Sequence, residues 1–251
     1  NPLNIFRLSG RLPGSGWACF RMVTIMMGIH GGKSSLLFSD KAWLTSERWN
    51  MPVDPKVAQL LCSRLCHNLA GSVGAVSAGL ELLEEAGAKD GGGNDDDALA
   101  LAVQSAKQTA CRLGFYRMAF GFGVGDESLA KARDLAVGLL DDGRVNLNWP
   151  KDPGLAADNV LGGNGVELLL NLILLGIDCL PRGGELGVHF ADLSDGVGMA
   201  IVASGPGARL KDEYLTVMTR DVPMDALTAH NVQAHFAWLL AEDLGAAIEI
   251  P

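Results

Sequence analysis

The sequence has little of what would assign it to several common classes of protein. Its five cysteines are an odd number in no regular framework, which argues against a disulfide scaffold and indicates a reducing cytoplasm. No uninterrupted apolar run reaches the roughly 18 residues that a membrane-spanning helix requires. The formal charge of −9 argues against nucleic acid as a partner, because contacts to phosphate need a basic face. We therefore expect a cytoplasmic globular protein with no nucleic-acid or membrane partner.

Residues 1–50 differ from the remainder of the chain. They carry six basic against two acidic side chains and show no sustained period of 2 or 3.6 residues. The apolar run 22–29 resembles the hydrophobic region of a signal peptide but is not followed by a clear cleavage site. Residues 32–34 match the end of a phosphate-binding loop, yet Met27 stands where that pattern needs glycine. We predict that residues 1–53 are an N-terminal extension that is disordered or over-called.

Two long helices are predicted next, over residues 54–86 and about 98–122, joined by a polar, glycine-rich loop. Asp54 and Pro55 supply an N-cap and a first-turn proline for the first helix. One apolar stripe follows that helix at a period near 3.6, through Val57, Leu61, Leu65, Leu69, Val73, Val76, Leu80 and Leu83. A hairpin of two such helices exposes a wide apolar seam. Pairing with a second copy as a four-helix bundle is the simplest way to bury it.

His67 is the candidate functional residue of the first helix. It lies two residues from both Leu65 and Leu69, roughly 200° around the axis from the apolar stripe, so its side chain faces away from the core. Arg64 precedes it by one turn and Gly71 follows it by one turn. Such a histidine is accessible to another protein. The alternative is a solvent-facing histidine with no role.

The second half of the chain, residues 126–251, has an α/β pattern after a glycine-rich linker. The predicted helices cover residues 127–141, 156–180 and 225–244, and the predicted strands cover 145–149, 185–192, 198–204 and 246–250. Together with the helical hairpin of residues 54–122, this pattern predicts an α+β protein of two domains.

Other polar groups admit simpler interpretations than a site. Cys62 and Cys66 are four residues apart on one helix, but a zinc site needs four convergent ligands and no second pair is present, so we predict two buried cysteines and no metal. The glycine cluster 162–165 is interpreted as a helix-entry loop. His235 is predicted to pack in the core, and His189 to face a cross-strand partner.

Residues 54–250 resemble the ChpT-type histidine phosphotransferases, which are dimeric relay proteins built like a sensor histidine kinase without working ATP chemistry. The resemblance rests on two stretches and on the kinase-like second half. The first stretch, SRLCHNLAGSVGAVSAGLELL, covers residues 63–83, and the second, CRLGFYRMAFG, covers residues 111–121. The implied architecture is a dimeric four-helix bundle followed by a degenerate ATPase-like α/β sandwich domain.

The resemblance also indicates which ATP contacts are lost. Residues 170–176 resemble the kinase helix whose usual form is N-L-x-x-N-A, with Asn171 kept and Leu175 in place of the asparagine that coordinates Mg²⁺. Ala203 replaces the aspartate that binds the adenine amino group, and residues 227–231 contain no glycine where a glycine-rich segment is expected. Leucine cannot bind a hard cation and alanine cannot accept a hydrogen bond from adenine. We expect no ATP, no other cofactor and no metal.

The implied function is a histidine phosphotransferase that relays a phosphoryl group between the aspartates of two response-regulator receiver domains through His67. Mg²⁺ belongs to the receiver, and the setting is bacterial cell-cycle signalling. Arg64 would contact phosphate or the acidic pocket of the receiver, and Gly71 and Gly74 would let a receiver helix approach. Asn68 stands where kinases carry an acidic residue; it can form hydrogen bonds but cannot act as a base. The alternatives are a non-catalytic dimeric scaffold for receivers and an ATP-dependent kinase.

Overall fold

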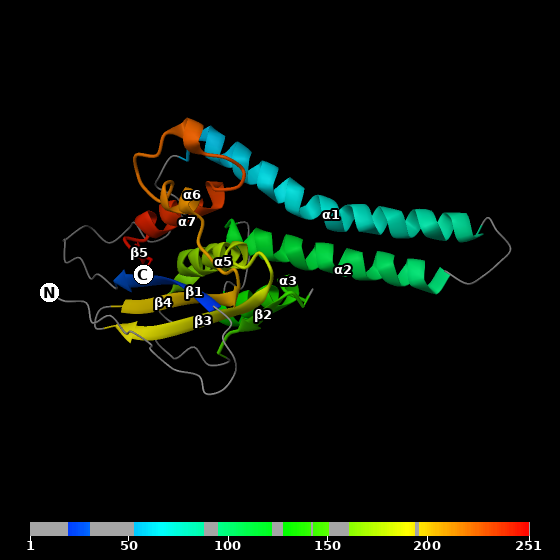
Figure 1. The fold of residues 1–251 in the computed structure, drawn as a ribbon, viewed down its shortest axis with the longest axis horizontal. Coiled ribbons are helices and arrows are strands. Elements are labelled where there is room, and N and C mark those ends of the chain that lie inside the picture. Colours follow the sequence, from blue (N-terminus) through cyan, green and yellow to red (C-terminus); the bar gives the residue numbers. More distant parts are fainter. Residues whose placement is uncertain are drawn as a thin grey trace, which may run out of the picture.

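A computed structural model describes residues 20–30 (backbone only), 53–87, 95–121, 128–141, 143–150, 161–193 and 196–250. Helices α1 (Pro55–Gly87) and α2 (Asp95–Ala119) form a long antiparallel hairpin that projects from the rest of the molecule (Figure 1). The first helix thus has the predicted bounds to within a residue. The second begins and ends three residues earlier than predicted.

The remaining elements form a sheet covered by helices, so the chain is α+β as predicted. The sheet has the order β2-β3-β4-β1-β5; β2 and β3 are parallel and the other neighbours are antiparallel. Strand β1 (Phe20–His30) precedes the hairpin in the chain. The helices and strands that follow the hairpin are, in chain order, α3 (Leu129–Leu139), β2 (Val145–Asn148), α5 (Gly162–Asp178), β3 (Gly184–Leu193), β4 (Gly196–Pro206), α6 (Asp212–Leu215), the 3-10 turn η2 (Met224–Ala226), α7 (Val232–Asp243) and β5 (Ala247–Glu249). None of the helices in the described ranges is long and apolar enough to cross a bilayer.

Strand β1 (Phe20–His30) corrects part of the prediction for the N-terminal segment. We predicted a disordered or over-called extension over residues 1–53, but residues 20–30 lie in the sheet between β4 and β5. In sequence, an interior strand has the form of a short apolar run without alternation. The run at residues 22–29, which we compared with a signal peptide, has this form. Residues 1–19 and 31–52 of the predicted extension lie outside the described residues.

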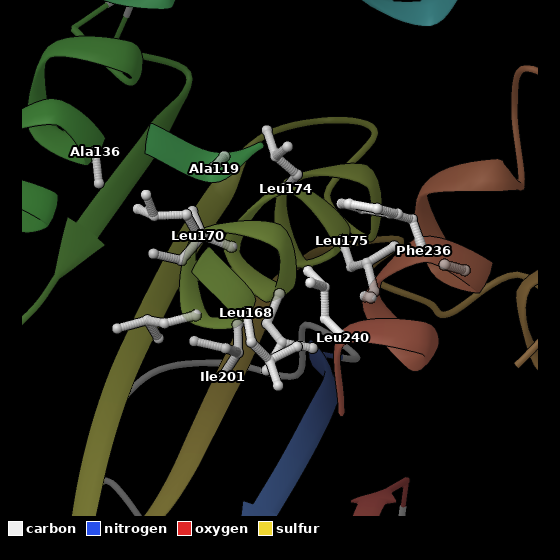
Figure 2. Close-up of a cluster of buried hydrophobic side chains, with 14 of the residues drawn as sticks. Ala119, Ala136, Leu168, Leu170, Leu174, Leu175, Ile201, Phe236 and Leu240 are labelled. Atoms are coloured by element: carbon white, nitrogen blue, oxygen red, sulfur yellow. The ribbon is translucent and has the colours of Figure 1, made fainter. Parts of the chain in front are cut away.

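Helix α5 is the centre of the core. Every residue from Gly165 to Gly176 is buried, because the helix lies between the sheet on one side and α2 and α7 on the others (Figure 2). Gly176 is required at the sheet contact, since a Cβ there would lie 2.9 Å from the Ile201 side chain. The nearly continuous apolar run of this helix follows from burial on all sides.

Helix α7 begins at Val232, seven residues later than the predicted start at residue 225. The intervening residues form η2 and a turn fixed by Asn231, whose Oδ1 accepts from the Thr228 amide at 2.8 Å and whose Nδ2 donates to the Ala226 carbonyl at 3.0 Å. This buried asparagine side chain bonds to the backbone of the turn that precedes the helix and so competes with helix formation there.

A buried polar network joins the hairpin to the second domain. The Asn171 side chain donates to the carbonyl of Ala119, the last residue of α2, at 2.6 Å, and it accepts from Gln233 of α7 at 2.5 Å. Both side chains are almost fully buried. We expect Asn171→Ala to lower the free energy of unfolding by about 2–3 kcal/mol, because it leaves the Ala119 carbonyl and the Gln233 amide without partners.

Urea denaturation at one fixed protein concentration measures this effect. Asn148→Ala is the matched control, because Asn148 is exposed at the end of β2 and donates to the Glu185 carboxylate, at 3.2 Å, in an exposed contact. Its expected effect is below about 0.5 kcal/mol. Equal losses in the two variants would show that the network carries no special stability.

The apolar stripe of α1 is core only at its beginning. Val57 and Leu61 are buried, but Val73 and Leu80 are about half exposed, at 49% and 52%. A second stripe on α2 is also exposed; it consists of Leu99, Val103, Ala106, Ala110 and Leu113. The steps of three and four residues in both stripes are those of helices that pack in a bundle. The hairpin therefore has an apolar face that the described residues leave uncovered.

Candidate functional site

His67 is exposed on the middle of α1, as predicted from its distance around the axis from the apolar stripe. The residues that follow it on the same side are small and exposed: Ala70, Gly71 and Gly74. A Cβ added at Gly71 or Gly74 would meet no atom within 4 Å. The fold does not require glycine at either position, so the open backbone next to His67 is available to another molecule.

Asn68 fixes the turn of α1 that carries His67. Its Nδ2 donates to the hydroxyl of Tyr116 on α2 at 3.3 Å, and its carbonyl accepts from Arg112 Nη1 at 3.0 Å. Burial raises the pKa of Tyr116, which keeps the phenol protonated and able to bond. The amide of Asn68 is therefore directed at α2, and Arg112 and Tyr116 are site residues that sequence reasoning missed.

The side chain of Arg64 is engaged by the second domain. Its Nη2 forms an ion pair with Asp178, the last residue of α5, and its Nη1 donates to the carbonyls of Ala229 and His230 at 3.4 and 3.3 Å. The predicted contact between Arg64 and phosphate stays a prediction; the guanidinium has other partners in this structure. Asp178 gave no signal in the sequence beyond a polar interruption of an apolar helix.

Both cysteines beside His67 are exposed, so the prediction that they are buried is wrong. Cys62 and Cys66, four residues apart on α1, are both left exposed by the described part of the chain. Among the described residues, no three histidine, cysteine or acidic side chains converge as a metal site would require.

The other histidines of the described ranges differ from His67 in their surroundings. His235 is buried in α7 as predicted, with its Nδ1 2.8 Å from the Val217 carbonyl, and burial lowers its pKa. His189 is exposed on β3, opposite Ala200 of β4. His230 is exposed in the turn before α7.

The three positions that the resemblance connects with ATP lie inside the protein. Asn171 and Leu175 are fully buried in α5, and Ala203 of β4 is 1% exposed. Figure 2 shows Leu175 among the side chains of Phe236 and Leu240 of α7. The side-chain amide of Asn171 donates to the carbonyls of Ala119 and Glu167 and accepts from the Gln233 side chain. The side chains at these positions thus serve the core and the junction between the domains.

Comparison with known proteins shows the family to which the chain belongs. A family model described as the histidine phosphotransferase C-terminal domain matches residues 129–251. Protein phosphotransferase ChpT of Brucella abortus (strain 2308) is 36% identical over 195 residues, which are 76% of this chain and 88% of that protein. A solved structure of a bacterial phosphotransferase is 33% identical, with a TM-score of 0.63, over 78% of this chain and 90% of that one. The chain therefore belongs to the ChpT-type histidine phosphotransferases and is a phosphotransferase enzyme.

Proposed function

We propose that this protein relays a phosphoryl group from the aspartate of one receiver domain to that of another, with His67 as the intermediate carrier and without ATP. The observation that carries the proposal is the position of His67, exposed on a helix whose following residues leave room for a partner. An aspartyl phosphate is already an activated donor, so a relay needs a nucleophile held in line and little further machinery.

The chemistry of each step balances without a co-reactant. A neutral imidazole nitrogen of His67 attacks the phosphorus, the bond from phosphorus to the aspartate oxygen breaks, and the receiver leaves as a carboxylate. In the second step the aspartate of another receiver attacks and the imidazole leaves. Mg²⁺ in the receiver's own acidic pocket would neutralise the charge that develops on the phosphoryl oxygens.

The surroundings of His67 suit a helix of the receiver. The side of α1 with Gly71 and Gly74 carries small, uncharged residues, and the hydrogen bonds of Asn68 to α2 hold that turn in place. The acidic pocket of a receiver would be directed at His67 while its helix lies along the two glycines. We expect a rigid-body encounter of this kind to need no rearrangement of α1.

The absence of ATP chemistry is supported by what occupies the former contact points. The buried leucine at position 175 offers no oxygen to a metal, and Ala203 offers no acceptor to adenine. The segment 227–231 before α7, where the resemblance leads one to expect glycines, is fixed by Asn231 and by the contacts of Arg64. We therefore expect nucleotide to leave the thermal unfolding temperature unchanged.

We further propose that two copies pair through the uncovered apolar face of the hairpin. The exposed leucines and valines of α1 and α2 are spaced for a four-helix bundle, and His67 lies on the opposite side of α1 from that face. The dimer would bury the apolar stripes and leave both His67 side chains accessible to receivers.

The test uses a radiolabelled, phosphorylated receiver domain and the full chain, mixed without ATP. We expect label on the chain that is labile to acid and stable to base, which is the behaviour of phosphohistidine. A parallel reaction with labelled ATP and no receiver should give no label. If receivers bind the chain but none transfers label, the protein is a scaffold; label from ATP alone would identify a kinase.

The glycines next to His67 give a prediction in which stability and function move in opposite directions. Gly71→Ala and Gly74→Ala should each raise the free energy of unfolding by about 0.5–1 kcal/mol, because glycine is a poor helix former and an added methyl meets nothing. Gly71→Leu and Gly74→Leu should weaken receiver binding about tenfold or more, since a branched side chain displaces the receiver helix.

Thermal unfolding and calorimetric titration with a receiver domain check the two effects. Gly79→Ala on the same helix is the contrasting control, because its methyl would lie 2.9 Å from the backbone nitrogen of Ala102. This variant should destabilise the hairpin. Unchanged receiver binding by both leucine variants would place the docking surface elsewhere.

A further inference from the structure

The side chain of Arg64 connects the helix that carries His67 to two separate segments of the second domain. Its Nη2 pairs with Asp178 at the end of α5, and its Nη1 donates to the carbonyls of Ala229 and His230 in the turn before α7. Only 15% of the Arg64 side chain and 24% of the Asp178 side chain are exposed. A pair so far withdrawn from water is screened much less than a surface ion pair.

Asp178 also accepts a hydrogen bond from a residue other than Arg64. The hydroxyl of Tyr214, a nearly fully buried residue of α6, donates to the same Asp178 oxygen at 3.0 Å. Burial, together with the charge of Asp178, raises the pKa of Tyr214, so the phenol stays a donor. Two donors on one carboxylate oxygen fix its position and therefore that of the guanidinium.

This junction lies one helical turn from His67. Arg64 and His67 are three residues apart on α1, so the second domain is tied to the helix immediately beside the proposed carrier. Figure 1 shows the beginning of α1 lying against α7 and the segment before it. Any receiver that docks on the His67 side of α1 must fit the space that the placement of this domain leaves.

We propose that Asp178 is a positioning residue for phosphoryl transfer, which acts through Arg64 by fixing the second domain against the His67-bearing turn of α1. The inference rests on the proposed role of His67 as carrier and assigns Asp178 a task within it. On this view Arg64 serves transfer through its partner in the second domain. A direct contact between Arg64 and phosphate would instead require the guanidinium to leave Asp178.

A double-mutant cycle of Arg64→Gln and Asp178→Asn distinguishes the two roles. The rate of label transfer from a saturating phosphorylated receiver is measured together with the final fraction of chain that becomes labelled. We expect each single variant to be about tenfold slower, and the double variant to be no slower than the slower single, because both changes break one contact. The final labelled fraction should stay at the wild-type value, whereas a merely structural defect would lower it.

Three results would overturn the inference. Multiplied effects in the double variant would mean that Arg64 and Asp178 act independently. A faster Asp178→Asn variant would mean that release of Arg64 aids transfer, as a direct phosphate contact requires. A reduced labelled fraction with an unchanged rate would mean that the pair is needed only for folding.

Two controls complete the experiment. The pair of Arg220 and Glu242, whose atoms are 2.5 Å apart and whose arginine side chain is 77% exposed, offers a matched cycle of Arg220→Gln and Glu242→Gln that should not change the rate. Arg64→Lys, which keeps the charge, should recover part of the rate lost in Arg64→Gln. If wild-type chain takes no label from any receiver, the proposed function itself fails, whereas wild-type labelling with independent effects contradicts the role of Asp178 alone.

Discussion

The His67→Ala variant is expected to take no label from a phosphorylated receiver, while its binding to the same receiver falls by no more than a few-fold. The reason is that alanine removes the nucleophile but leaves the open surface of Gly71 and Gly74 unchanged. Alanine has no atom that can bond to phosphorus, and positioning cannot compensate for the loss of a covalent carrier. We therefore expect the label on the His67→Ala variant to fall below detection.

The measurement is label transfer without ATP, followed by binding of the unphosphorylated receiver to the same preparations. His230→Ala is the matched control: His230 is also exposed and lies in the turn contacted by Arg64, but only its backbone carbonyl takes part in that contact. It should be labelled like the wild type. Label that persists in His67→Ala and disappears in His230→Ala or His189→Ala would assign the carrier to another histidine.

Sequence predicted correctly several features that depend on a single helix, such as the bounds of α1 and the exposure of one of its side chains. The exposure of His67 follows from its angle to an apolar stripe, and α1 itself follows from its period and its N-terminal Asp54-Pro55. Helix α5 was likewise predicted from its apolar run, within the predicted range 156–180. Local periodicity carries this information, because the side of a helix is fixed by residue spacing alone.

The sequence failed where two distant segments decide the outcome. Nothing in the sequence shows that Arg64 meets Asp178, 114 residues further along the chain, or that Asn68 meets Tyr116. Strand β1 was missed because an interior strand shows no alternation and its partners, β4 and β5, lie far away in the chain. The exposure of Cys62 and Cys66 depends on which side of α1 the second domain covers, which is a tertiary property.

The uncovered face of the hairpin leads to the second prediction of large effect, a change of oligomeric state. Val103→Glu combined with Leu113→Glu is expected to convert a dimer into a monomer. In one chain these side chains are 44% and 50% exposed, and burying the remainder in a dimer would contribute on the order of 1 kcal/mol for each side chain and copy. A carboxylate placed in the same interface would lose its hydration and lack a partner.

Sedimentation equilibrium over a range of concentrations measures the change. Leu215→Glu is the matched control, since Leu215 is 48% exposed but lies on α6, outside both stripes. This variant should remain a dimer. A wild-type chain that is monomeric throughout, or equal dissociation of the control, would contradict pairing through the hairpin.

The same variant separates assembly from chemistry. His67, Asn68, Arg112 and Tyr116 all belong to one chain, and His67 lies away from the stripes, so a monomer keeps every contact of the site. Among the described residues, however, the outer part of the hairpin is held by little besides its own two helices, and a helix pair with a solvated apolar face is only marginally stable. We therefore expect the monomer to lose helicity at the loop end of the hairpin, measured by circular dichroism, before it loses phosphoryl transfer at His67. Loss of transfer at full helicity would instead show that a second copy completes the site.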